Sequence, residues 1–250
     1  MPDAKIVPIV LHGIVRDGMR RNFEDVEQST LRQMLSYCRG RFLDSATLTS
    51  SVNDVEVGRW LFTFDDGLSS DFELALPLLI DAGCRAISFA ISDRIGTPGF
   101  VTAPQLREMA SHGVLVGSHS ASHPDFTTLS DADVRNELEG SKKRIEDALG
   151  KEVGCFSFPF GRVDGRSVEF AFRAGYRRVF TSRHGIASFD AKVFPRNSIH
   201  GGMPIEAVRK ALDARASTRW AWWMEDKLKA MIIDTVGKEQ YLKIRGIVAE

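Results

Sequence analysis

Residues 60–67 are Trp-Leu-Phe-Thr-Phe-Asp-Asp-Gly, an apolar run that leads directly into two acids and a glycine. The run is short and aromatic, which predicts a buried β-strand that ends at Asp65 and Asp66. α/β folds place their chemistry at the carboxyl ends of parallel strands. Neighbouring strand residues point to opposite sides, so one acid can bind a metal while the other takes protons. The alternative interpretation is an Asp-Gly turn with two solvated acids.

Similar apolar runs recur along the chain and are separated by amphipathic segments. Strands are predicted at Ile6–Leu11, Trp60–Phe64, Ala86–Ile91, Val114–Val116, Val153–Phe158 and Arg178–Thr181. Helices are predicted at Glu24–Cys38, Ser70–Ala82, Thr102–Gly113, Ser130–Leu149 and Asp164–Ala174. Ser188–Gly202 is expected to be irregular loop. This alternation predicts parallel strands joined by right-handed crossovers, in either an open doubly wound sheet or a barrel.

The composition is that of a globular chain. Of the 250 residues, 43% are hydrophobic, and acids and bases balance at 33 each. A substantial core is therefore expected, and no basic excess indicates binding to nucleic acid. Three sparse cysteines, Cys38, Cys84 and Cys155, indicate buried apolar residues and no disulfide framework. We recognise no signal peptide and no membrane-spanning run, so a cytoplasmic location is expected.

A second motif follows the strand predicted at Val114–Val116. Residues 118–124 are Ser-His-Ser-Ala-Ser-His-Pro. His119 and His123 are four residues apart and would face the same way on a helical turn, where they can share one metal. The alternative is a pair of surface or capping histidines. With Asp66 as third ligand, the set is typical of a catalytic metal site that keeps positions open for water and substrate.

Two further predicted strand ends carry candidate residues. Residues 156–161 are Phe-Ser-Phe-Pro-Phe-Gly, which taken alone indicate a buried strand closed by a proline turn. His12 follows the apolar run at residues 7–11. A lone histidine at such a place is more often a satisfied core residue than a catalyst, but His12 shares its strand-end position with the other candidates.

Together these four segments resemble the polysaccharide deacetylase family, also called the NodB-homology carbohydrate esterases. Thr63–Gly67 matches its TFDDG motif residue for residue, and residues 119–123 match its His-x-x-x-His motif. Phe156–Gly161 is similar to its aromatic-Pro-aromatic-Gly turn. The resemblance covers residues 6–200, and it implies a distorted (β/α) barrel of about seven parallel strands, which resolves the open choice of fold.

The resemblance also implies roles for individual residues. The family's ligands for a divalent metal, zinc by default, correspond to Asp66, His119 and His123. Its catalytic base corresponds to Asp65. The substrate's oxyanion would be held by the metal and by a backbone N–H near Phe160, in the turn that begins at Pro159.

The sequence departs from the family pattern in two places. Ser157 stands where the usual motif has an arginine that orients the base, and we predict that Arg196 supplies the missing guanidinium. The usual general acid is a histidine near the end of the domain, for which His200 is a weak match. A permuted branch of the family uses instead a histidine at the first strand, and His12 resembles that pattern. We favour His12.

The last part of the chain differs in composition from the rest. Residues 1–217 are expected to form the catalytic domain, and residues 218–250 a helical extension. Trp220, Met224, Leu228 and Met231 fall on one stripe of a helix. We expect this helix to pack on the barrel or on a second copy in a homodimer. The other interpretation is an interfacial helix that binds the membrane surface.

The function implied by the resemblance is metal-dependent hydrolysis of N-acetyl groups on an amino-sugar-containing glycan or its precursor. The N-acetylated sugar would be the substrate. One alternative is an amidohydrolase or deformylase that acts on a small or lipid-linked substrate, because such a metal site can attack any accessible amide. Another is a sugar-binding protein whose catalytic site has decayed.

Overall fold

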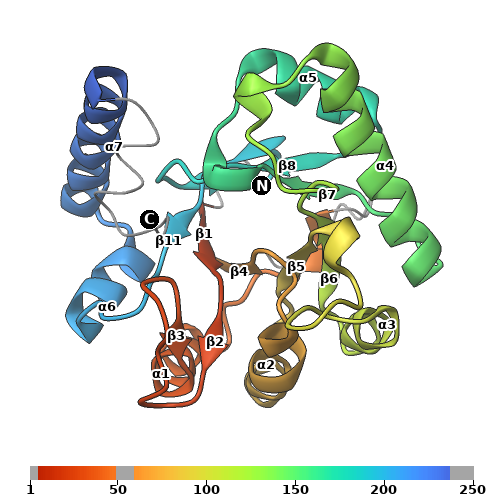
Figure 1. The fold of residues 1–250 in the computed structure, drawn as a ribbon. Helices are drawn as coiled ribbons and strands as arrows, with labels where there is room; N and C mark the ends of the chain where they lie inside the picture. Colours follow the sequence, from red (N-terminus) through yellow and green to blue (C-terminus); the bar gives the residue numbers. More distant parts are fainter. Residues whose placement is uncertain (1–4, 49–58, 237–250) are drawn as a thin grey trace.

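Strands and helices alternate along the chain, as the sequence predicts (Figure 1). The computed structural model describes residues 5–48 and 59–236. The strands are β1 (Lys5–Leu11), β2 (Ile14–Val15), β3 (Val26–Glu27), β4 (Trp60–Phe64), β5 (Ile87–Ala90), β6 (Leu115–Ser118), β7 (Cys155–Ser157), β8 (Arg178–Phe180), β9 (Ala187–Ser188), β10 (Val193–Phe194) and β11 (Asn197–Ser198). The helices are α1 (Gln28–Cys38), α2 (Leu76–Ala82), α3 (Ala103–Ser111), α4 (Asp131–Leu149), α5 (Gly165–Arg173), α6 (Ile205–Asp213) and α7 (Ala216–Val236).

The main sheet curls into a nearly closed barrel. Its strands follow the order β10-β8-β7-β6-β5-β4-β1-β11, and each of these neighbours pairs in parallel. β9 adds an antiparallel pairing to the start of β1. Only Pro195 and Arg196 separate the two edge strands β10 and β11 in the chain, so the edges lie close together. The predicted barrel is confirmed, with eight strands along its main path.

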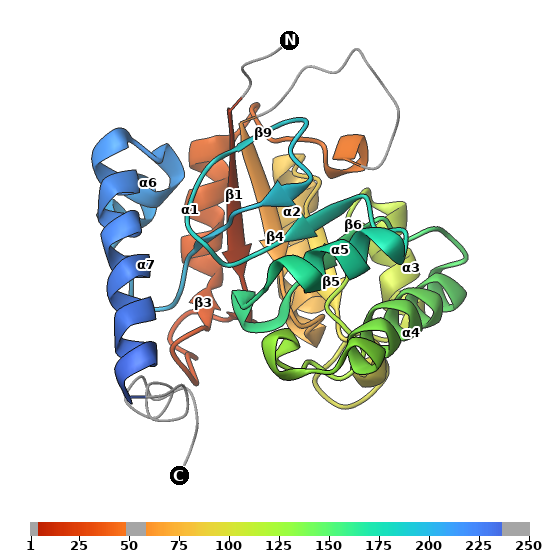
Figure 2. The ribbon, with the colours of Figure 1, turned by 90° about the horizontal axis from the view of Figure 1, so that it is seen from above.

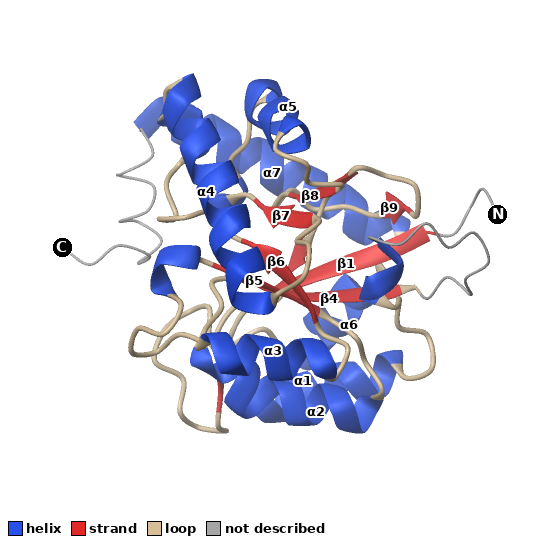
Figure 3. Ribbon diagram, turned by 90° about the vertical axis from the view of Figure 1, so that its right-hand side faces the viewer, coloured by secondary structure: helices blue, strands red, loops and turns tan. Residues whose placement is uncertain are grey.

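The alternation of side chains separates the barrel interior from the layer beneath the helices. On β4, Leu61 packs with Ile87 and Phe89 in one buried cluster. Its neighbours Trp60 and Phe62 belong to a second buried cluster, which also contains the apolar side chains that the helices direct toward the sheet. Figure 3 shows α1, α2 and α3 on one side of the strands, and α4 and α5 on the other. Continued alternation along β4 directs the side chain of Asp65 toward the interior, at the carboxyl end of the barrel.

The segment expected to be irregular loop contains two strands, so that prediction was wrong. β10 and β11 both lie within Ser188–Gly202. Each has two residues, which is too short to produce a recognisable alternation of apolar and polar residues. Their pairing depends instead on neighbours far away in the sequence. Asn197, for example, is fully buried and donates a hydrogen bond to the carbonyl of Pro8 (3.1 Å).

Helix ends follow the capping residues that the sequence contains. Ser130 caps α4 by accepting a hydrogen bond from the N–H of Asp133, and Gly150 ends it in the left-handed conformation (φ 69°). The helix predicted from Glu24 begins later, at Gln28. The helix predicted at Ser70–Ala82 starts with a π-helical turn, Asp71–Ala75, before α2.

The C-terminal helix α7 lies along one side of the barrel (Figure 2). It begins at Ala216, two residues before the expected extension, and residues 237–250 of that extension lie outside the described residues. Trp222 faces the barrel and stacks on His184, with ring centroids 5.4 Å apart. The predicted stripe faces away, since Trp220 is 66% exposed and Met231 is 59% exposed. Within the described ranges, no helix combines the length and apolar character needed to cross a membrane.

Candidate active site

Three candidate metal ligands meet at the carboxyl ends of β4 and β6. Asp66 follows β4, and His119 and His123 lie in the loop after β6. The Nε2 atoms of both histidines lie 3.5 Å from Oδ1 of Asp66. One ligand atom from each residue lies within 4.8 Å of the other two. The structure therefore brings together the three side chains that the sequence singled out.

The arrangement of these ligands fits a divalent ion. Nitrogen and oxygen ligands lie about 2.0–2.2 Å from zinc, so two of them at a tetrahedral ion are about 3.4 Å apart. The two separations of 3.5 Å between histidine and Asp66 match this spacing. His119 is 2% exposed, whereas His123 and Asp66 are 26% and 25% exposed. The site is thus closed on the side of His119 and open to small molecules on the other.

Hydrogen bonding and burial leave the histidine nitrogens available as ligands. Nδ1 of His119 lies 2.8 Å from the carbonyl oxygen of Ser157, and a carbonyl only accepts. The proton therefore sits on Nδ1, and Nε2 carries a lone pair directed toward Asp66. Burial, followed by the charge of His119, lowers the pKa of His123 to about 4. A neutral imidazole is the form that binds a metal.

Strained backbone is concentrated in the loops that carry these residues. Among described non-glycine residues, positive φ angles occur at Asp66 (75°), Ser120 (70°), His123 (67°), Phe160 (58°) and Ala214. All but Ala214 belong to the strand-end loops of the site. Such conformations persist only where surrounding contacts impose them, and they are often found at functional sites.

Asp65 forms a buried ion pair with Arg196. The guanidinium donates from Nη1 to Oδ1 (2.6 Å) and from Nη2 to Oδ2 (2.7 Å), a two-point contact with both carboxylate oxygens. Arg196 is fully buried, and Asp65 is 2% exposed. Nη2 also donates to Oγ of Ser157 (2.8 Å), which in turn donates to Asp65 (3.2 Å). The arginine predicted to compensate for Ser157 therefore lies against both residues.

This ion pair fixes the charge of Asp65. Burial is the largest single effect and would raise the pKa of the Asp65 carboxyl, but several opposing effects, led by the charge of Arg196, together hold that pKa well below its usual range. The charge of His119, the hydrogen bonds from Arg196 and the charge of His12 lower the pKa further. Asp65 is therefore ionised, and its charge is directed into the barrel.

The two candidates for the general acid, His12 and His200, follow neighbouring strands but have different surroundings. His12 follows β1, whose last residue pairs with Phe64 of β4, so it adjoins the acidic motif. A positive charge on His12 would lower the pKa of both Asp65 and His123, so His12 lies close enough to both side chains to interact with them electrostatically. His200 follows β11, on the far side of β1, and its ring stacks on Phe23 at 3.9 Å.

The proline turn places Phe160 at the edge of the metal site. Pro159–Gly161 forms a short helical turn, and the ring of Phe160 packs edge-on against His123 with centroids 4.7 Å apart. Phe160 is 45% exposed. A Cβ at Gly161 would lie 2.2 Å from Cβ of Ser182, so only glycine allows this turn to pack so closely on the loop after β8.

The sequence analysis did not identify two serines, Ser157 and Ser120, that support the residues of the site. Ser157 was noted only as a departure from the family motif, yet it connects Arg196, Asp65 and His119. Oγ of Ser120 accepts a hydrogen bond from the N–H of His123 (2.9 Å). Serines in loops usually bind nearby backbone, so their type alone gave no signal, and only the spatial neighbours identify them.

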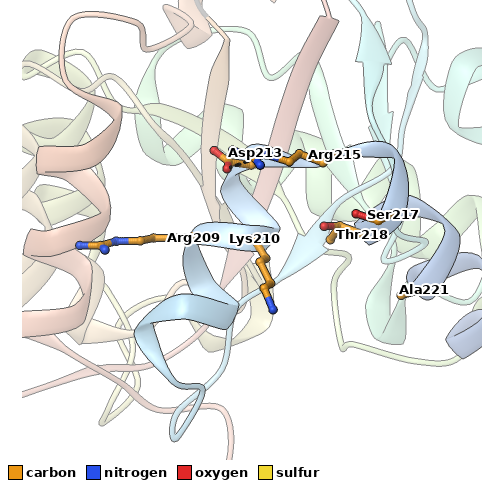
Figure 4. A pocket seen from close by; sticks show the side chains of 7 residues that line it. All are labelled: Arg209, Lys210, Asp213, Arg215, Ser217, Thr218 and Ala221. Atoms are coloured by element: carbon orange, nitrogen blue, oxygen red, sulfur yellow. Dashed lines mark ion pairs between the residues drawn. The ribbon is translucent and has the colours of Figure 1, made fainter.

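A surface hollow of about 540 Å³ lies elsewhere, between α6 and the start of α7 (Figure 4). Arg209, Lys210 and Arg215 line it, and Arg215 pairs with Asp213 at 3.3 Å. None of the candidate catalytic residues lines this hollow. The hollow therefore has no part in the chemistry of the strand ends.

Comparison with known proteins agrees with the geometry of the site. The profile of the family described as polysaccharide deacetylase matches residues 53–179, slightly more than half of the chain. The chain belongs to the polysaccharide deacetylase family. The matched segment contains Asp65, Asp66, His119, His123 and the proline turn, so the family assignment covers all three candidate metal ligands.

Individual relatives cover only part of this family member. It is 31% identical to the Bacillus subtilis protein YxkH over 134 residues, which are 54% of this chain and 48% of YxkH. It is 30% identical over 145 residues to peptidoglycan-N-acetylglucosamine deacetylase PgdA of Listeria monocytogenes, covering 56% of this chain and 29% of PgdA. The chain thus spans about half or less of the length of these curated relatives.

Solved structures share the fold over most of the chain. The deacetylase PplD of Streptococcus pyogenes superposes with a TM-score of 0.74 at 22% identity, covering 85% of this chain and 99% of PplD. IcaB of Ammonifex degensii gives a TM-score of 0.70 at 21% identity, with 84% and 97% coverage. At this identity the likeness supports the fold alone.

Proposed function

We propose that this family member is a metal-dependent hydrolase that removes N-acetyl groups from an amino-sugar-containing glycan or glycan precursor. One observation carries the proposal: the Asp66, His119 and His123 ligand set lies beside an ionised carboxylate that a buried arginine holds in place. The names of the relatives support the substrate class, since PgdA is described as a deacetylase of peptidoglycan N-acetylglucosamine. We propose zinc as the metal, although the ligand set suits other divalent ions too.

Each catalytic group has one task in this proposal. A bound divalent ion would polarise the acetyl carbonyl and lower the pKa of a water molecule. Asp65 accepts a proton from that water as its oxygen bonds to the carbonyl carbon. The backbone N–H of Phe160 donates to the carbonyl oxygen as negative charge develops there. The C–N bond then breaks, and the products are acetate and a free amine.

The departing nitrogen needs a proton, and we propose that His12 supplies it. The electrostatic influence of His12 on Asp65 and His123 supports this role, as does its place beside β4. The ring of His200 is instead engaged in stacking on Phe23. This assignment would place the chain in the permuted branch of the family, which carries its acid at the first strand. Arg196 acts through Asp65, as a positioning residue.

The test combines metal content with product analysis. The purified protein should bind about one divalent ion per chain, the amount expected for a single site. It should release acetate, without formate, from oligomers of N-acetylglucosamine. His123→Ala should lose both properties. A wild-type protein that binds no metal after zinc is added would contradict the proposal and favour a sugar-binding role. Release of formate from formylated amines alone would favour the deformylase alternative.

We also propose that residues 218–250 form an extension to a catalytic domain of residues 1–217. The outward-facing stripe of α7, which includes Trp220 and Met231, supports a contact with a membrane surface or with a second copy of the chain. Flotation with anionic vesicles and measurement of the oligomeric state, with and without Trp220→Glu, distinguish these partners. The expected cytoplasmic location and the expected lack of nucleic-acid binding remain predictions.

A further inference from the structure

The loop between the two candidate histidine ligands has an unusual conformation for its sequence. Residues 119–123 contain no glycine, yet Ser120 and His123 both adopt positive φ angles. These conformations place the two Nε2 atoms at equal distances of 3.5 Å from Asp66. Something outside the loop must stabilise the arrangement, because side chains disfavour it.

The carboxylate of Glu137 makes three contacts with the middle of this loop. Oε2 accepts hydrogen bonds from the backbone N–H groups of Ala121 (2.8 Å) and Ser122 (2.9 Å). Oε1 accepts from the hydroxyl of Ser122 (2.7 Å). All three donors belong to Ala121 and Ser122, two of the three residues between the histidines of the His-x-x-x-His motif. Hydrogen bonds to a charged acceptor are shorter and stronger than neutral ones, and these distances are within that range.

The opposite side of the same loop is held by backbone groups after β5. The N–H of Ser92 donates to the carbonyl of Ser120 (3.1 Å), and the N–H of Asp93 donates to that of Ala121 (3.1 Å). The loop therefore lies between two supports, and Glu137 is the side-chain support. Replacement of Glu137 would leave the N–H of the buried Ala121 and the N–H of the exposed Ser122 without their carboxylate acceptor, and would release one side of the loop.

The helix that carries Glu137 does not depend on this contact for its own position. α4 is capped by Ser130, and it buries Val134, Leu138 and Ile145 against the core. Oγ of Ser141 also accepts a hydrogen bond from Ser118, the last residue of β6 (2.8 Å). A change at Glu137 should therefore alter the loop while α4 stays docked.

We propose that Glu137 is a positioning residue for the metal site, and that it sets metal affinity by fixing the spacing of His119 and His123. This inference rests on the proposed function, which requires a metal at these ligands. Indirect supports of this kind typically contribute about 10–100-fold to metal affinity. The Glu137 carboxylate lies outside the ligand set, so its replacement should change the dissociation constant for zinc more than it changes kcat at saturating zinc.

The test is a zinc titration of the full chain against a competing chelator. Glu137→Ala should weaken zinc binding by about 10–100-fold. Glu137→Gln keeps one acceptor oxygen and should give a smaller loss. Glu139→Ala is the matched control, because Glu139 lies exposed on the same helix, two residues from Glu137 and therefore on a different face; it should bind zinc like the wild type. At saturating zinc, kcat of Glu137→Gln should return toward the wild-type value, which a general loss of folding would not allow.

The outcomes separate the positioning role of Glu137 from the proposed function. Unchanged zinc affinity in folded Glu137→Ala, or in Glu137→Gln if the alanine variant does not fold, overturns the positioning role and leaves the proposed hydrolase intact. Equal weakening by Glu139→Ala also overturns it, because the effect would then come from the charge of α4. A wild-type chain that binds no zinc overturns the proposed function itself.

Discussion

Replacement of Arg196 by alanine should destabilise the folded protein far more than an ordinary arginine substitution. The fully buried guanidinium binds both oxygens of Asp65, and its loss leaves that carboxylate buried without a positive partner. Removal of one partner from a buried ion pair costs about 3–5 kcal/mol of unfolding free energy. In a chain of this size, 1 kcal/mol lowers Tm by about 2–4 °C, so we expect a decrease of roughly 6–20 °C.

The assay is chemical and thermal unfolding of four proteins at pH 7. These are the wild type, Arg196→Ala, the double variant Arg196→Ala/Asp65→Asn, and Arg209→Ala as an exposed control. The double variant replaces the unpaired charge by a neutral amide, so it should recover much of the loss. The control should remain within about 0.5 kcal/mol of the wild type.

The effect should also depend on pH in a defined direction. In the wild type, the pKa of Asp65 is lowered in the folded state, so its stabilising contribution is present above the unfolded pKa of about 3.9 and is lost only at lower pH. Without Arg196, burial raises the pKa of Asp65, and the variant becomes less unstable as the carboxyl takes up a proton. The stability difference should therefore shrink between pH 7 and pH 4. A loss below about 1 kcal/mol at pH 7, or no recovery in the double variant, would refute the reasoning.

Three further predictions concern the acid, the metal and a buried carboxyl. His12→Ala should lower kcat about 10²–10⁴-fold and His200→Ala less than about tenfold; similar losses at both sites, measured as acetate release, would contradict a single acid. Zinc at about 100 times its dissociation constant should stabilise the wild type by about 2.7 kcal/mol, reversibly with EDTA; the same increase of Tm in His123→Ala would exclude this site. Burial holds the pKa of Asp71 well above its usual value, so the folded protein keeps a proton that the unfolded chain releases above about pH 3.9. Retention of this proton lowers the free energy of unfolding as pH rises. Asp71→Asn should therefore have a higher Tm than the wild type, by a margin that grows from pH 5 to pH 8. A constant margin would contradict the explanation.

The acidic motif was the part of the site most accessible from sequence. Residues 60–64 form a strand with the predicted bounds, and Asp65 and Asp66 follow it directly. The histidine pair was likewise identified by its spacing and by the strand before it, although the residues from His119 to His123 form a loop with two positive φ angles and the expected helical turn was wrong. Local patterns succeed here because the turn residues and the alternation of apolar side chains are properties of adjacent positions. The pattern even assigned different surroundings to the two acids, through the two-residue period of a strand.

Other parts of the site depend on contacts between distant segments. The guanidinium of Arg196 reaches Asp65 across 131 positions of sequence, because β10 and β11 form the two edges of the curled sheet. The sequence suggested Arg196 only from its place after the last predicted strand. Ser157 and Glu137 had no such signal, since serines and glutamates are common on surfaces and in loops.

The sequence by itself determined which residues stand at the ends of the central strands, and therefore the acids and imidazoles available for binding a metal. Only the tertiary structure decided how the barrel closes, which strands form its edges, and which side chains hold the base and the histidine loop in place. The physical reason is that strand ends and ligand spacing follow from neighbouring residues. The closure of the barrel and the contacts that hold the base and the histidine loop depend on how distant segments pack, and the identity of a residue alone predicts little of that packing.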